Sequence, residues 1–219
     1  MKPEDDPSIG NATANPESEP VEKQEGVTRV EAFSDGVIAI IVTIMVLELK
    51  APTDEALGAL WRLWPVFIAY VLSYAYVAIY WVNHHRLFSH ARVVTNGLLW
   101  ANIGLLFALS LVPFSTAYLG EHHFGRDATL LYLATMLLPS VSYAILQKVI
   151  VDTGADTEGS RLYHKATSRK GLAASAAYLV GMPLSFVSPW LGVACAALVA
   201  VFWMLPWSPL DRLFLKLPS

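Results

Sequence analysis

Long stretches without a single charged residue constrain this chain more than any other feature. Four segments contain no Asp, Glu, Lys or Arg, namely residues 63–83, 93–120, 128–147 and 171–210. A helix that crosses a bilayer needs about 20 mainly apolar residues, so each of the first three segments fits one helix. The last segment is long enough for two helices and is interrupted by "PLSFVSPW" (183–190), which predicts a tight turn between them.

A further apolar stretch, "RVEAFSDGVIAIIVTIMVLEL" (29–49), raises the predicted number of spans to six. Charged residues make up only 15% of the chain, against about 25% in soluble domains. The sequence therefore predicts an all-α integral membrane protein with six transmembrane helices per protomer. We place these helices at residues 29–49, 60–83, 93–119, 128–150, 169–187 and 190–206.

The two ends of the chain differ from this membrane domain. Residues 1–28 are rich in Glu, Asp, Pro and Asn and lack apolar periodicity, which predicts a disordered tail. They contain no apolar segment of the kind that a signal peptide requires. The predicted organisation is a tail over residues 1–28, a membrane domain over 29–206 and a short tail over 207–219.

The basic residues indicate the orientation in the membrane. Loops on the cytoplasmic side carry an excess of Lys and Arg. With a cytoplasmic N-terminus, only Lys50, Arg62 and Arg126 of the 15 basic residues fall outside. Both termini are therefore predicted to be cytoplasmic. Trp residues near the proposed span ends, among them Trp64 and Trp81, fit the preference of aromatic rings for the membrane interface.

The first predicted helix combines an aspartate with an apolar stripe. At 100° per residue, Ile40, Ile44 and Leu47 lie on one narrow stripe with Thr43 beside it. Asp35 points about 140° away from Ile40 by the same helical geometry. The aspartate and the stripe therefore face different neighbours.

Asp35 needs an explanation because an unpaired carboxylate inside a membrane is costly. A buried polar network is the main hypothesis, with Arg29, His84, His85 and Asn102 as candidate partners. Direct ion coordination by a ring of Asp35 side chains is a second hypothesis. A proton relay between Asp35 and His84 or His85 in a secondary transporter is a third.

Sites for other chemistry are not indicated. The histidines at 84, 85 and 90 lack the i, i+4 spacing of a helical zinc site, and "EHH" (121–123) lies on the other side of the predicted membrane. Phosphate loops and nucleophile motifs are absent from the sequence. We expect no enzymatic activity, no cofactor, no bound metal and no nucleic-acid partner. The lone Cys195 excludes a disulfide within the chain and is expected to serve packing.

The opening motif resembles the first helix of the transmembrane protein 175 family, the endolysosomal potassium channels and their prokaryotic relatives. That family is marked by an Arg, a Phe-Ser-Asp four residues later and an apolar helix with an internal Thr; here these are Arg29, "FSD" (33–35) and Thr43. "YWVNHHRLFSH" (80–90) and "ANIGLLFALSLVPFSTAYL" (101–119) are similar to its second and third helices. The resemblance extends over about residues 28–150.

The resemblance implies a homotetramer of six-helix protomers whose first helices surround a pore at the oligomer axis. The positions that carry over to the hydrophobic pore constriction and lining are Ile40, Thr43, Ile44 and Leu47. The positions that carry over to a structural polar network are Arg29, Phe33, Ser34, Asp35, His84, His85 and Asn102. Such a network would place the aspartate behind the pore instead of on its surface.

We therefore expect a potassium-preferring cation channel that conducts passively through a central pore. Its partners would be three further copies of the chain, the lipid bilayer, and potassium and other monovalent cations. Its location would be a prokaryotic cell membrane. The alternative is a proton-coupled secondary transporter that uses Asp35 and His84 or His85, although such proteins usually show internal repeats and broken helices.

Overall fold

The structure is a bundle of helices. The computed structural model describes residues 18–52, 57–154 and 158–204, and regular structure in these ranges is entirely helical. The helices in chain order are α1 (Ser18–Leu47), α2 (Gly58–Arg62), α3 (Trp64–Phe88), α4 (Asn96–Ser110), α5 (Val112–Glu121), α6 (Arg126–Thr153), α7 (Glu158–Val187) and α8 (Pro189–Met204).

Five segments of the described chain are long and apolar enough to cross a membrane. They lie in α1, α3, the α4–α5 pair, α6 and α7. The last predicted span corresponds to α8, which has 16 residues and is therefore about 24 Å long. The hydrocarbon core of a bilayer is about 30 Å thick, so α8 as described is shorter than a full span.

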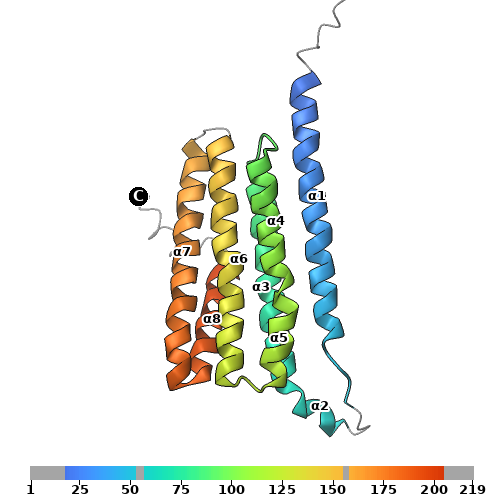
Figure 1. Cartoon of the computed structure of the whole chain (residues 1–219), viewed down its shortest axis with the longest axis vertical. Coiled ribbons are helices and arrows are strands. Elements are labelled where there is room, and N and C mark those ends of the chain that lie inside the picture. The colour runs from blue at the N-terminus through green and yellow to red at the C-terminus, as the bar shows by residue number, and fades with distance from the viewer. Residues whose placement is uncertain (1–17, 53–56, 155–157, 205–219) are drawn as a thin grey trace, which may run out of the picture.

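The helices run side by side, with α1 at one edge of the bundle (Figure 1). The α1 helix packs against α3, α4 and α5, whereas α7 packs mainly against α6 and α8. The α6 helix lies between these two groups, because it contacts α4 and α5 as well as α7 and α8. One long side of α1 consequently has no partner among the described residues.

Prolines and a threonine mark where several helices begin. Pro65 and Pro113 lie in the first turns of α3 and α5, and Pro189 is the first residue of α8. Proline is tolerated there because the first amide groups of a helix have no partner within the helix. At α4, the Thr95 hydroxyl accepts a hydrogen bond from the Leu98 amide at 3.1 Å, a typical N-cap.

A glycine allows α3 and α5 to pack closely. A Cβ atom on Gly120 would lie 2.7 Å from the Cα atom of Val66. Small residues at such crossings permit close approach of helix backbones. This contact holds α5 against the start of α3, at the end of the bundle where α1 also ends.

The structure departs from the sequence-based expectations at several boundaries. The α1 helix begins at Ser18, so residues 18–28 are helical and the predicted disordered tail is wrong there. Their sequence, "SEPVEKQEGVT", contains several good helix formers. The α7 helix begins at Glu158, before the predicted residue 169. The third predicted span is divided into α4 and α5 at Leu111. Residues 1–17 and the predicted tail over 207–219 lie outside the described residues.

Candidate functional site

One face of α1 attaches this helix to the bundle. Its buried side chains recur at intervals of three, four or seven residues, which is the pattern of a single helix face. They are Val27, Ser34, Ile38, Ile41 and Met45, none more than 7% exposed. The attachment is therefore narrow and fixes how α1 is rotated about its axis.

The opposite side of α1 carries the apolar stripe that was predicted to line a pore. Ile40, Ile44 and Leu47 are 59%, 41% and 75% exposed within the protomer. Thr43 lies beside them, and its hydroxyl donates a hydrogen bond to the Ile40 carbonyl at 2.9 Å. The Thr43 hydroxyl is thus held by its own helix, with the oxygen still free to accept a further bond.

A buried hydrogen-bond network joins α1, α3 and α4. The Ser34 hydroxyl, which is fully buried, donates to the Val30 carbonyl at 2.8 Å. The same oxygen accepts a bond from Asn102 Nδ2 at 2.8 Å. Asn102 Oδ1 lies 2.9 Å from His84 Nε2. Three of the residues predicted for a polar network are therefore brought together.

The direction of these bonds fixes the tautomer of His84. Because the Asn102 amide donates to Ser34, its oxygen faces the imidazole and accepts a bond from Nε2–H. The neutral ring then carries no proton on Nδ1, and this buried atom has no hydrogen-bond partner among the described residues. The ring stacks on Phe88 with centroids 4.3 Å apart, so His84 is enclosed between α4 and its own helix.

A second set of contacts lies next to this network and holds acidic groups of α1. Trp81 Nε1 donates a hydrogen bond to Asp35 Oδ1 at 3.0 Å. One turn away, His85 Nδ1 lies 2.7 Å from Glu31 Oε1. Glu31 and Asp35 are spaced i, i+4 on α1, and Trp81 and His85 have the same spacing on α3, so each helix presents its two side chains on one face. We call these four residues the α1–α3 clamp.

Two predicted members of the network lie outside it. Arg29 and Phe33 are exposed, and Arg29 forms no ion pair with Asp35 in the described part of the chain. Arg29 and Asp35 are six positions apart, which makes their side chains point about 120° apart on a helix. Glu31 and Trp81 were missed as site residues, although the matching i, i+4 spacings of Glu31 with Asp35 and of Trp81 with His85 could have indicated them.

A groove runs along the C-terminal half of α1, beside the apolar stripe. On the α1 side it is bordered by Val37, Ile40, Ile41, Ile44 and Glu48. On the other side it is bordered by Ser110 and the α5 residues Pro113, Phe114 and Ala117. The stripe therefore faces an open apolar surface that α1 and α5 share.

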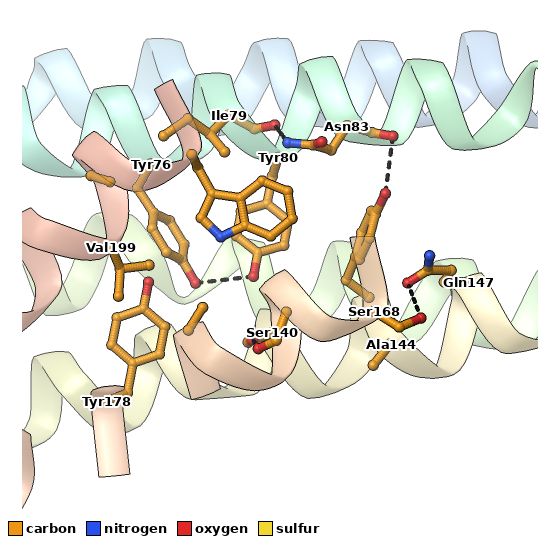
Figure 2. A pocket seen from close by; sticks show the side chains of 15 residues that line it. Tyr76, Ile79, Tyr80, Asn83, Ser140, Ala144, Gln147, Ser168, Tyr178 and Val199 are labelled. Carbon is orange, nitrogen blue, oxygen red and sulfur yellow. Dashed lines mark hydrogen bonds between the residues drawn. The ribbon is translucent and has the colours of Figure 1, made fainter. Parts of the chain in front are cut away.

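A small cavity lies on another face of α3, between α3, α6, α7 and α8 (Figure 2). Its volume is about 30 Å³, which is room for about one or two water molecules. Hydroxyl groups surround it: Ser140 Oγ lies 2.8 Å from Ser175 Oγ, and the Tyr143 hydroxyl donates to the Asn83 carbonyl at 3.1 Å. None of its lining residues belongs to α1, so the cavity is separate from the apolar stripe.

The described residues contain no cluster of metal-ligating side chains. No three His, Cys, Asp or Glu side chains gather there in a way that could hold a metal ion. Glu31, Ser34 and Asp35 of α1 are instead bonded to His85, Asn102 and Trp81. The arrangement therefore positions a helix.

Comparison with known proteins gives a consistent family. Residues 29–113 match the sequence model of the family described as endosomal/lysosomal potassium channel TMEM175. A potassium channel of Chryseobacterium sp. (strain P1-3) is 41% identical over 179 residues, which cover 81% of this chain and 92% of that protein. The human endosomal/lysosomal proton channel TMEM175 is 39% identical over 105 residues, which cover 42% of this chain and 19% of the human protein.

A solved structure is also similar. The crystal structure of a lysosomal potassium-selective channel TMEM175 homolog from Chamaesiphon minutus superposes with a TM-score of 0.72 and 32% sequence identity. The match covers 82% of this chain and 96% of that one. The similarity thus extends well beyond the segment that carries the opening motif.

Proposed function

The chain belongs to the TMEM175 family, and on that premise we propose that it is a potassium-preferring cation channel that conducts passively through a pore formed by four copies. The family resemblance expected from "FSD" (33–35) is thereby confirmed. The relatives that match most of this chain are named as potassium channels. The chain is a multi-pass membrane protein and not an enzyme, and potassium is the permeant ion, not a cofactor.

The observation that carries this proposal is the division of α1 into two faces. Its buried face packs on α3, α4 and α5, while Ile40, Ile44 and Leu47 remain 59%, 41% and 75% exposed. A helix that only needed to anchor in lipid would not require a dedicated polar clamp to set its rotation. Four such helices around an axis would place the stripe on the pore surface. They would also cover the side of α1 that is exposed in the single protomer.

Rings of Ile and Leu can control conduction by dewetting. An apolar neck excludes water when narrow and passes ions when slightly wider. Because the neck is narrow, an ion entering it must shed part of its hydration shell, and no carbonyl ligands replace the lost water. This costs less for the larger and more weakly hydrated potassium ion than for sodium, which gives a physical basis for a preference without a carbonyl filter.

The polar residues behind the stripe would then act as a positioning device. The α1–α3 clamp and the Ser34–Asn102–His84 network attach to α1 near its middle, on the N-terminal side of the stripe. In this proposal Asp35 holds the stripe toward the axis and does not itself line the constriction. The lining by Thr43 and the exact ring positions belong to the same proposal.

The membrane arrangement we propose has six spans, with α8 as the last. Both termini would be cytoplasmic, because the basic residues concentrate on that side. The clamp would then lie in the cytoplasmic half of the membrane and Glu48 at the outer end of α1. The relatives that match most of this chain come from bacteria, which favours a prokaryotic cell membrane as the location.

The proton-coupled transporter is less well supported. Among the described residues no hydrogen bond joins Asp35 to His84, since Trp81 binds the aspartate and Asn102 binds the histidine. His85 is paired with Glu31 instead. A relay would need these separate pairs to exchange partners during each transport cycle.

Purified protein in liposomes under a potassium gradient tests the function. The channel hypothesis expects passive potassium flux that needs only a charge-balancing proton carrier and exceeds sodium flux under matched gradients. Flux that requires a second transported substrate would instead support the transporter. No cation flux from a folded tetramer would rule out the channel.

A further inference from the structure

The end of α1 carries an acid that helix stability does not explain. Glu48 follows the last helical residue, Leu47, and the last turn of α1 has no basic residue. The carbonyl groups at a helix C-terminus carry partial negative charge, so an acid there is unfavourable. A structural role at this position would favour Lys or Arg.

Lys50, the nearest basic residue along the chain, is paired with another acid and not with Glu48. Lys50 Nζ forms an ion pair with Glu121 Oε1 of α5 at 3.1 Å. Among the described residues, the Glu48 carboxylate makes no hydrogen bond and no ion pair. The end of α1 therefore combines an uncompensated helix terminus with an uncompensated carboxylate.

Glu48 also lies in line with the apolar stripe. Ile40, Ile44 and Glu48 are spaced at i, i+4 and i+8, and all three border the groove beside α5. The acid is only half-buried, so its charge is accessible to ions in the adjoining water. In a tetramer built around α1, four copies would surround the outer mouth of the pore.

We propose that Glu48 raises the concentration of cations at the outer mouth of the pore and so sets conductance at low ionic strength. This inference rests on the proposed channel function. The carboxylates need not bind an ion at a fixed position, because charge of one sign around a mouth with low-dielectric walls attracts counter-ions through its field. Salt weakens such a field, since the Debye length falls from about 30 Å at 0.01 M to about 3 Å at 1 M.

Single-channel recording in a planar bilayer of neutral lipid tests this role. Glu48→Gln should lower potassium conductance about twofold at roughly 20 mM KCl and leave it unchanged at roughly 1 M. The loss should be larger for ions that enter from the side of Glu48. Glu48→Asp, which keeps the charge, should restore conductance at low salt.

A matched control separates this effect from general surface charge. Asp127→Asn removes one negative charge at the same end of the bundle, but on α6, where Asp127 pairs with Arg126 at 3.3 Å. Its conductance should equal that of the unaltered protein at both salt concentrations. Equal loss in Asp127→Asn and Glu48→Gln would overturn the assignment to Glu48.

Two further outcomes are distinguishable. A folded tetramer of Glu48→Gln that conducts less at low and high salt alike, or that loses nothing at low salt, contradicts the role of Glu48 while the channel function stands. Absence of potassium current in the unaltered protein would overturn the channel function and this inference together.

Discussion

Trp81 donates a hydrogen bond from its indole nitrogen to Asp35 Oδ1 at 3.0 Å, so a ring of α3 holds the aspartate in the apolar stretch of α1. The neighbouring pair of Glu31 and His85, 2.7 Å apart, repeats this link one turn away. A charge that is costly within a membrane thus has a specific partner. The proposed channel uses this pairing to fix which face of α1 meets the pore.

Asp35→Ala should weaken the tetramer more than it changes selectivity. The substitution removes the acceptor for Trp81 and should cost about 1.5 kcal/mol, the lower end for hydrogen bonds to charged groups, because Asp35 is only half-buried. Thermal denaturation followed by size-exclusion chromatography measures the loss. Trp81→Phe, which keeps an aromatic ring but has no donor, should show a similar shift. An Asp35→Ala tetramer of unaltered stability but changed potassium preference would show that Asp35 lines the pathway.

The bond between Ser34 and Asn102 should appear as an energetic coupling. A double-mutant cycle of Ser34→Ala and Asn102→Ala should give a coupling energy of about 0.6 kcal/mol and at most about 1.7, the range for hydrogen bonds between membrane helices. Reversible unfolding in detergent provides the free energies. Ser110→Ala paired with Asn102→Ala is the control, because the one hydrogen bond of the exposed Ser110 hydroxyl to a described residue is to Phe107 of its own helix. Additive effects of Ser34→Ala and Asn102→Ala would contradict the coupling.

Ile40→Asn should raise ion flux and reduce the preference for potassium over sodium. The amide would hydrate the neck, so ions would pass with more of their water. Paired potassium and sodium fluxes into liposomes measure the change. Val46→Asn is the matched control, because Val46 is also on α1 and 48% exposed but points about 120° away from Ile40. If Val46→Asn alters selectivity and Ile40→Asn does not, the constriction lies on the other face.

Two glycine substitutions should have opposite effects on stability. A Cβ atom on Gly171 meets nothing within 4 Å, so Gly171→Ala should stabilise α7 by about 0.5–1 kcal/mol through helix propensity. Gly120→Ala should destabilise by about 1–3 kcal/mol, because its Cβ would lie 2.7 Å from the Val66 backbone. Thermal unfolding of both variants decides the matter. Equal shifts for the two would contradict the close packing of α3 on α5.

Hydropathy predicted most of the helical segments. The predicted span at 128–150 lies within α6 (Arg126–Thr153), since a charge-free run of that length has few alternatives in a membrane. The polar start of α7 was missed because residues 158–168 carry no hydropathy signal, although they continue the same helix. Hydropathy does not show the division at Leu111, since both α4 and α5 are apolar.

The site was less accessible to sequence reasoning. Helical geometry separated Asp35 from the stripe of Ile40, Ile44 and Leu47, because that separation depends on one helix alone. The hydrogen-bond partners of Asp35 and Ser34 depend on how α1, α3 and α4 are rotated against one another. The sequence of a single helix does not determine that rotation. Trp81 was therefore taken as an interfacial aromatic and not as the partner of Asp35.

The most direct test of the central claim is silver block of potassium flux through single-cysteine variants. Silver is a thiol-reactive cation close to potassium in size, and replacing Cys195, the only native cysteine, with Ser removes the background reaction. We predict that silver abolishes flux through Ile40→Cys and leaves Val46→Cys unaffected, because Ile40 lies on the pore stripe and Val46 does not. Block of Val46→Cys with an unaffected Ile40→Cys would contradict the assignment of this stripe to the pore.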